Sequence, residues 1–175
     1  MMPRDGHQFR VWLDREPAEA EIEALGSVCD DAGLSYGNGM GELDFDRAAA
    51  SFADAVFSAI ADVEGSTRLH VTAIEADPLV SVMDIAERAG RTREAVRQAI
   101  NGLRARRFPP PVNGAGARHR LWRWSEVAAF YGIDDDRTRQ AARVADAVNG
   151  WLALRRSVPG LAPSADAVAE AVRAA

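Results

Sequence analysis

Arginine side chains are the residues of this sequence with the clearest chemistry, and nearly half of them lie in one segment. Residues 78–131 contain 10 arginines against 4 aspartates and glutamates, a net charge of +6. Residues 1–77 contain 5 arginines against 16 acidic residues, a net charge of −11. Guanidinium groups bind phosphates and hydrogen-bond to the edges of bases. A basic segment in an acidic chain therefore indicates a local surface for an anionic partner, and we expect this partner to be double-stranded DNA.

The sequence offers little for catalysis or metal binding. The single cysteine, Cys29, can form neither an internal disulfide nor a cysteine zinc cluster. The histidines His7, His70 and His119 lack the spacing of metal ligands. No Cys-His, Ser-His-Asp or paired-carboxylate arrangement is local in the sequence. We therefore expect a protein that is not an enzyme and that uses no metal and no cofactor.

The glycine-rich segment Gly37–Gly41 has two interpretations. Its glycine content is that of a phosphate-binding loop, but it lacks a lysine, does not open directly into a helix and is followed by Glu42, Asp44 and Asp46. Glycine and asparagine tolerate positive φ, which favours the turn of a β-hairpin. We therefore interpret the segment as a hairpin turn.

The composition is that of a soluble globular protein. Hydrophobic residues make up 47% of the chain and charged residues 27%, and no run of about 18 uncharged apolar residues is present to cross a bilayer. Residues 1–14 lack the apolar core of a secretory signal. We expect no membrane contact and a cytoplasmic location.

Two short helices position the first arginines of the basic segment. Ser81 followed by Asp84 is a capping pattern that starts one helix, and Gly90 ends it. A second helix is predicted from Thr92 to Leu103, with Thr92 as its N-cap. Its apolar face consists of Ala95, Val96, Ala99, Ile100 and Leu103. Its outward face consists of Arg93, Glu94, Arg97, Gln98 and Asn101. This face either reaches phosphates and base edges or is an ordinary solvated helix face.

A hairpin and a third helix follow the second helix. The strands Phe108–Val112 and His119–Trp124 flank a turn at residues 113–116, and this hairpin forms a wing. The helix after it is predicted to be capped by Ser125. We expect Leu121, Trp122 and Trp124 to belong to the core. The side chain of His119 either contacts a phosphate or is only solvated.

The segment Met83–Val96 resembles a bacterial helix-turn-helix. It has alanine at the crowded contact between the helices, glycine in the turn and an aliphatic residue six positions after that glycine. Arg91 departs from the pattern, because the family usually has an apolar residue there. Together with the hairpin and the helix that begins Trp124–Val127, residues 78–131 are similar to the winged domains of the MerR and excisionase type.

This resemblance implies that the second helix enters a major groove while the wing holds the flanking backbone. The arginines between the helix and the wing would strengthen binding without adding sequence choice. The residues that we expect at the DNA are Arg91, Thr92, Arg93, Arg97, Gln98, Asn101, Arg104, Arg106, Arg107, Arg118, His119 and Arg120.

The acidic segment before the basic one predicts a β-α-β-β-α-β order. The strands are expected at residues 8–14, 34–36, 42–46 and 69–74, and the helices from Pro17 to Gly33 and from Phe52 to Gly65. This order resembles the ferredoxin-like fold, an antiparallel four-stranded sheet with two helices on one face. Such a sheet hosts many functions, so the resemblance carries no activity.

The last part of the chain is predicted to be helical. A helix of about 20 residues follows Asp134–Asp136 and ends before Pro159, and a short helix capped by Ser164 comes after it. In proteins of the MerR type such a helix pairs two protomers, which gives Trp151 and Leu152 a role in a homodimer. The alternative is that the helix folds back on its own chain.

Taken together, these patterns predict an α+β protein with three parts. Residues 1–77 form an acidic ferredoxin-like domain for regulation or assembly, residues 78–132 a winged helix-turn-helix, and residues 133–175 the C-terminal helices. The expected function is sequence-specific DNA binding by a bacterial transcriptional regulator. Two alternatives stay open. In the first the acidic domain binds a basic protein, as an antitoxin binds a toxin, and in the second its sheet holds a small molecule that alters the affinity for DNA.

Overall fold

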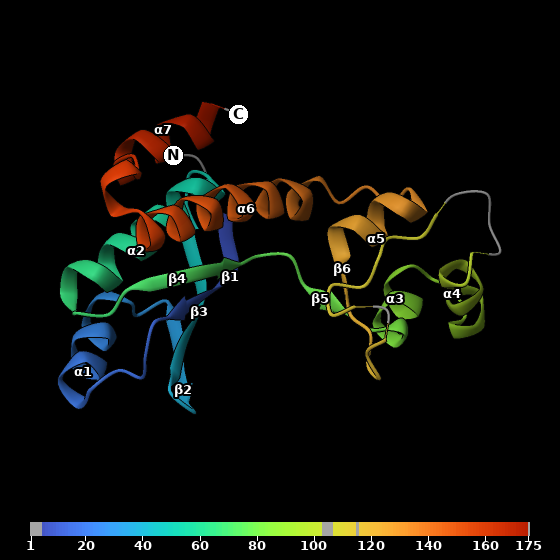
Figure 1. Cartoon of the computed structure of the whole chain (residues 1–175), viewed down its shortest axis with the longest axis horizontal. Coiled ribbons are helices and arrows are strands. Elements are labelled where there is room, and N and C mark those ends of the chain that lie inside the picture. The colour runs from blue at the N-terminus through green and yellow to red at the C-terminus, as the bar shows by residue number, and fades with distance from the viewer. Residues whose placement is uncertain (1–4, 103–106, 115, 175) are drawn as a thin grey trace. The chain divides into compact units, whose positions relative to one another are not determined.

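A computed structural model of the chain describes residues 5–102, 107–114 and 116–174, and these residues divide into two compact units (Figure 1). Unit 1 comprises Met1–Ala76 and Arg143–Ala175, and unit 2 comprises Asp77–Ala142. Residues 133–175 were predicted to form a part of their own, whereas most of them, from Arg143 on, belong to unit 1. No helix among the described residues has both the length and the apolar character needed to span a bilayer.

Unit 1 is built on a four-stranded antiparallel sheet, which confirms the α+β class. The strand order is β2-β3-β1-β4, and every neighbouring pair of strands is antiparallel. The elements up to the last strand are β1 (Asp5–Leu13), α1 (Glu19–Val28), β2 (Ala32–Gly37), β3 (Met40–Ala49), α2 (Phe52–Ser66) and β4 (Val71–Glu75). The C-terminal elements are α6 (Asp136–Ser157), which starts in unit 2, η1 (Pro159–Leu161) and α7 (Ala165–Ala174).

The two faces of the sheet follow from alternation along the strands. Register places Phe9 opposite Phe45 and Val11 opposite Leu43, and all four side chains are buried. Because side chains alternate, the residues between them point to the other face. The turn between β2 and β3 is the predicted hairpin turn. Its two central residues both have positive φ, as a two-residue turn of this twist requires.

Two glycines do not end helices as predicted. Helix α1 ends at Val28, where the amide of Cys29 donates to the carbonyl of Leu25, and Gly33 lies inside β2. The strand starts early because Ala32 already pairs with β3. Gly65 lies within α2, so the helix continues past the predicted end. In neither place does the backbone need the left-handed conformation for which glycine is preferred.

The C-terminal part of α6 packs on unit 1 and does not leave its apolar face free. Trp151 and Leu152 are buried, and the Trp151 ring lies 5.9 Å from that of Phe57 on α2. The Asn149 side chain accepts a hydrogen bond from the Ile74 amide and donates one to the Ile74 carbonyl, at 2.7 and 2.9 Å. This contact occupies the free edge of β4. Within the protomer the helix therefore folds back on its own chain, and the homodimer stays a prediction.

Among its described residues, unit 2 contains three complete helices, the start of α6 and a small two-stranded sheet. Its elements are β5 (Leu79–Val80), α3 (Val82–Arg88), α4 (Arg93–Ile100), β6 (Trp122–Arg123) and α5 (Trp124–Tyr131). The core is formed by apolar side chains from all three helices and both strands, with Trp122, Ile85, Val96 and Val127 almost completely enclosed. Trp122 and Trp124 thus belong to the core, as predicted, whereas Leu121, also predicted there, is only half-buried.

The predicted wing hairpin is wrong in its strand pairing. Strand β6 pairs with β5, from the start of the unit, and the described residues of the 107–121 loop contain no strand. Pro109, Pro110 and Pro111 explain the difference, because three successive residues without an N–H group cannot build a β-ladder. One backbone bond between the two arms of the loop is present, from the Val112 amide to the Leu121 carbonyl at 2.8 Å.

Candidate nucleic-acid interface

Helices α3 and α4 are both started by side-chain caps, as the sequence predicts. Ser81 and Asp84 form a reciprocal capping box on α3, with the Asp84 carboxylate accepting from the Ser81 amide at 2.8 Å. This bond is the main reason that the pKa of Asp84 is lowered. The Thr92 hydroxyl accepts from the Ala95 amide at 3.1 Å and caps α4. Such caps contribute about 1 kcal/mol each to helix stability.

The turn between the helices depends on a glycine. Gly90 has φ of +60°, a left-handed conformation that other residues adopt only with strain. The next amide, that of Arg91, donates to the Ala86 carbonyl at 2.8 Å, which closes the end of α3. The Arg91 side chain is exposed. The arginine in place of the family's apolar residue is therefore accommodated because it points to solvent.

Helix α4 has two sharply different faces. Val96 and Ala99 have no exposed surface, whereas the polar side chains of the helix are exposed. At 100° per residue these polar side chains occupy an arc of about 140°. The exposed residues of this arc are Arg93, Glu94, Arg97, Gln98 and Asn101, the last being the C-cap residue. The predicted apolar and outward faces of the helix are thus both present. The helix ends at Ile100, and Leu103, which was predicted on the apolar face, lies outside the described residues.

The arginines of α4 are only loosely held by their neighbours. Arg97 and Glu94 form an ion pair at 3.9 Å, with side chains 63% and 68% exposed. Exposed pairs of this kind contribute at most about 1 kcal/mol, so a phosphate or a base could replace the carboxylate. Arg93 lies with Nη2 2.8 Å from the sulfur of Met83, which is itself exposed on α3. Both guanidinium groups are accessible to a ligand.

The other predicted contact residues are distributed over the turn and the 107–121 loop. Thr92 uses its hydroxyl in the helix cap, which leaves its lone pairs less available to DNA. Arg107, Arg118 and His119 are exposed on the loop. Arg120 is half-buried, with its guanidinium carbon 5.8 Å from the centre of the Trp122 ring. Arg104 and Arg106 lie outside the described residues.

Side-chain hydrogen bonds, and not strand pairing, fix the conformation of the 107–121 loop. The Asn113 amide group donates to the His119 carbonyl at 2.6 Å, and its oxygen accepts from the Leu121 amide at 3.1 Å. The Trp122 indole donates to the Pro109 carbonyl at 3.1 Å. The role of Asn113 was missed in the sequence, where it was assigned only to a turn. An asparagine side chain can imitate a backbone amide, which is the signal that could have indicated it.

Two aspartates fix α5 in unit 2 through side-chain contacts that were not predicted from the sequence. The buried Asp77 carboxylate accepts from the amide and the hydroxyl of Ser125, at 3.0 and 2.5 Å. Ser125 is therefore not the N-cap, which is Arg123. The Trp124 indole donates to Asp135 at 2.8 Å. Burial raises the pKa of Asp135, but the hydrogen bonds from Trp124 and Thr138 outweigh this effect and lower it.

Two arginines of residues 78–131, Arg88 and Arg123, were not included in the predicted contacts. Arg88 ends α3, is exposed and lies with its guanidinium carbon 5.3 Å from the centre of the Trp124 ring. This cation–π contact orients a positive charge at the end of the helix. Arg88 is one of the ten arginines counted in residues 78–131, but its helix, α3, was interpreted only as a packing element.

The outward face of the sheet in unit 1 has the opposite charge. Register places the acidic side chains of this face around Arg10, which bonds to Asp44 at 2.8 Å and lies 3.6 Å from Glu42. The hydrogen bond to Asp44 is the main reason that the pKa of Arg10 is raised. The remaining acidic residues of the face are Asp46 and Glu75. This face would repel a nucleic acid.

No group of three or more potential metal ligands is found in the part of the chain that the structure describes. Comparisons of the chain with protein-family models, with curated proteins and with solved structures find no match. The resemblance to winged domains of the MerR and excisionase type thus stays a prediction.

Proposed function

We propose that the chain is a sequence-specific DNA-binding protein, a transcriptional regulator in which unit 2 contacts the DNA. The observation that carries the proposal is the pair of faces on α4. Val96 and Ala99 fix the helix in the core, and the opposite arc presents accessible arginine and amide side chains. These are the side chains that hydrogen-bond to guanine and adenine in a major groove.

The proposed mechanism divides the contacts into two kinds. On α4, Arg93, Arg97 and Gln98 reach base edges, because the capped N-terminal half of such a helix enters the groove. On the 107–121 loop, Arg107 and Arg118 contact phosphates and set the register of the protein on the duplex. Arg97 exchanges its exposed ion pair with Glu94 for a contact with the DNA. No cofactor takes part in this mechanism.

The charge distribution supports the same division. The net charge of +6 over residues 78–131 attracts a duplex, and the acidic outward face of the sheet in unit 1 does not compete for it. Because DNA is a polyanion with condensed counterions, binding by this surface releases cations and depends steeply on salt. Unit 1 is proposed to serve regulation or assembly, which leaves DNA contact to unit 2.

The experiment starts by selecting a preferred duplex from a random pool with the full chain. Competition binding with the selected and with random duplexes is then measured for Arg97→Ala and Arg118→Ala. We expect Arg97→Ala to cost about 1–3 kcal/mol on the selected duplex and much less on random DNA. Arg118→Ala should weaken both equally and reduce the salt slope by about one.

The matched control is Arg143→Ala, which removes an exposed arginine of α6 in unit 1. It changes the net charge of the chain by the same amount as the two test variants and should leave both affinities nearly unchanged. If Arg97→Ala weakens binding to the two duplexes equally, α4 does not read the sequence. If Arg143→Ala has the effect of Arg97→Ala, the assignment of unit 2 is wrong.

A further inference from the structure

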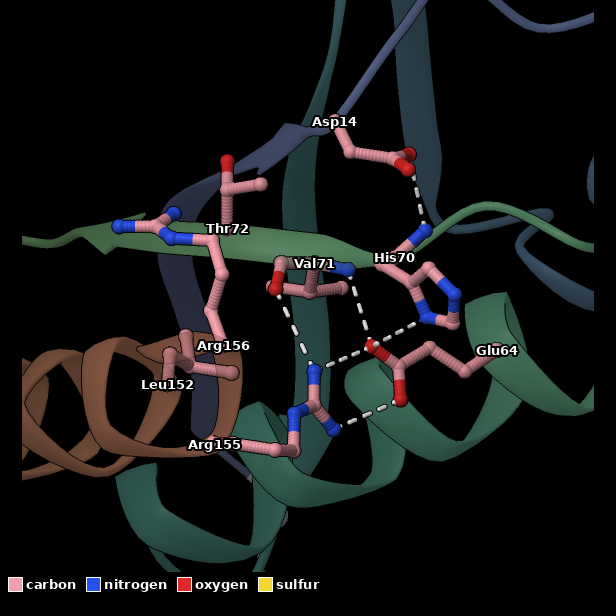
Figure 2. Close-up of a pocket in the computed structure, with 8 residues that line it drawn as sticks. All are labelled: Asp14, Glu64, His70, Val71, Thr72, Leu152, Arg155 and Arg156. Atoms are coloured by element: carbon pink, nitrogen blue, oxygen red, sulfur yellow. Dashed lines mark hydrogen bonds and ion pairs between the residues drawn. The ribbon is translucent and has the colours of Figure 1, made fainter. Parts of the chain in front are cut away.

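The two edges of the four-stranded sheet in unit 1 differ in what covers them. At the β4 edge, side chains of unit 1 bond to backbone groups that point away from the sheet. Glu64 accepts from the Val71 amide at 2.9 Å, and Arg155 donates to the Val71 carbonyl at 3.4 Å (Figure 2). Asn149 accepts from the Ile74 amide and donates to the Ile74 carbonyl. These bonds block the addition of a further strand at β4.

Strand β2 forms the other edge of the sheet (Figure 1). Asp31, just before β2, accepts from the Asp46 amide of β3 at 3.0 Å. Alternate residues of an antiparallel strand bond to the same neighbour, so every second residue from Asp31 onward bonds to β3. The amides and carbonyls of Leu34 and Tyr36 therefore point away from β3. Within the part of the chain that the structure describes, no strand and no side chain bonds to these groups.

The side chains along β2 leave this edge unprotected. Open edges are usually guarded by a charge, a proline or a bulge, and β2 has no charged residue, no proline and no break in its register with β3. On the acidic face of the sheet it presents only Gly33, Ser35 and Gly37. On the core face it presents Leu34, which is half-buried, and Tyr36, which is 56% exposed. The edge thus combines open hydrogen-bonding groups with an apolar strip.

From this edge we infer that two copies of the chain pair through β2, as antiparallel strands about a twofold axis at Ser35. In this register Leu34 lies opposite Tyr36 of the second copy, and the two residues exchange both backbone hydrogen bonds. The outward amides and carbonyls of Leu34 and Tyr36 are then used in both copies. Their side chains form an apolar cross-strand pair on each side of the axis. The two sheets become one continuous sheet.

A second copy fits this edge because the acidic residues of the sheet stay away from the contact. Glu42 and Asp44 lie on β3, one strand inside the edge. In the pair, the two β3 strands are three strand spacings apart, about 14 Å. This distance exceeds the Debye length of about 8 Å at physiological salt, so the repulsion is screened. A foreign strand would need matching side chains of its own, whereas the twofold axis makes β2 complementary to itself.

This inference concerns unit 1 and does not depend on DNA binding. It gives the chain a dimer contact different from α6, whose Trp151 and Leu152 are buried within the protomer. Strand β2 has 6 residues, and two such strands bury less than the about 1,200 Å² of a standard interface. We therefore expect a dissociation constant in the micromolar range, about 10–100 µM.

Sedimentation equilibrium of the full chain between about 2 and 300 µM tests the inference, because this range brackets the expected dissociation constant. The main variant is Ser35→Lys, which places two like charges directly opposite each other at the axis. Within one copy the lysine lies opposite Glu42, an opposite charge, so the fold is kept. We expect this variant to raise the dissociation constant about tenfold or more. The uncharged control Ser35→Thr should leave it within about twofold of the natural value.

Cysteine substitutions test the register of the pair. At the axis the two Ser35 positions form a non-hydrogen-bonded pair with Cα atoms about 4.5 Å apart, within reach of a disulfide. Ser35→Cys should therefore cross-link two copies in oxidised glutathione, whereas the natural Cys29 is buried. The matched control is Gly33→Cys, on the same face of β2 and with open space for a Cβ. Its two copies lie about 14 Å apart in this register, too far to cross-link.

Three results would overturn the inference. The first is a chain that stays monomeric up to about 300 µM. The second is an unchanged dissociation constant in Ser35→Lys, which would show that the dimer forms through another surface. The third is cross-linking of Gly33→Cys as fast as that of Ser35→Cys, which would contradict the register.

Discussion

Asp77 offers a direct test of how unit 2 is held together. Its carboxylate is 7% exposed and accepts two hydrogen bonds from Ser125 in the first turn of α5, at 3.0 and 2.5 Å. It thereby caps a helix that lies 48 residues further along the chain. Replacement by alanine removes both bonds and leaves the Ser125 amide without its acceptor.

The expected loss of stability in Asp77→Ala follows from these two hydrogen bonds. A partly buried donor that loses its acceptor costs about 1–3 kcal/mol, and the loss of a negative charge at a helix N-terminus adds a few tenths of a kcal/mol. We expect Asp77→Ala to lower the free energy of unfolding of unit 2 by about 2–3 kcal/mol. Ser125→Ala should cost about 1 kcal/mol, because the backbone amide keeps its bond.

Native-state hydrogen exchange of the α5 amides measures this loss in unit 2 separately from unit 1. A change of 2 kcal/mol accelerates exchange by about thirtyfold. The control is Asp134→Ala, which removes an exposed aspartate of the same unit and should stay within about 0.5 kcal/mol of the natural sequence. If Asp77→Ala exchanges no faster than this control, the carboxylate does not stabilise α5 and the reasoning fails.

Two further predictions concern unit 1. Arg47 is 7% exposed and bonds to Asp31 and Asp62 at 2.7 Å each. Arg47→Leu should lower the free energy of unfolding by about 3 kcal/mol, because two carboxylates lose their partner. Urea unfolding measures this loss, and a loss under about 1 kcal/mol would contradict the prediction. Bonds from Arg15 and from the Ala18 amide lower the pKa of Glu21 from 4.5 to about 2. The stability from Glu21 is therefore complete above about pH 4.5 and is lost as the pH falls through about 2. Thermal unfolding between pH 6 and 2 should show a flatter profile for Glu21→Gln, and identical profiles would refute the assignment.

The elements that the sequence predicts well are those with a clear local period. The alternation at Phe9 and Val11 indicates a half-buried strand, and the spacing of Val96 and Ala99 indicates which face of α4 is buried. The caps at Ser81 and Thr92 were also predictable, because capping acts over three residues. The helical spacing that indicates the buried face of α4 also indicates its exposed face.

Contacts between distant residues account for most of what was missed. The bond between Asp77 and Ser125, and the Arg155–Glu64 pair across 91 residues, leave no periodic trace in the sequence. The wing was assigned as a hairpin because a turn lies between two apolar runs, but the prolines before the turn cannot donate to a ladder. The free edge of β4 is occupied by Asn149, which no local pattern could indicate.

The salt dependence of DNA binding tests the central proposal most directly. The full chain is titrated with its selected duplex at salt concentrations between about 50 and 200 mM. If each protomer neutralises about 5 phosphates, the logarithm of the affinity should fall with the logarithm of salt with a slope of about −4 to −5, and twice that for a dimer. A flat response over this range, or no binding at the lowest salt, would contradict the assignment of unit 2 as a DNA-binding surface.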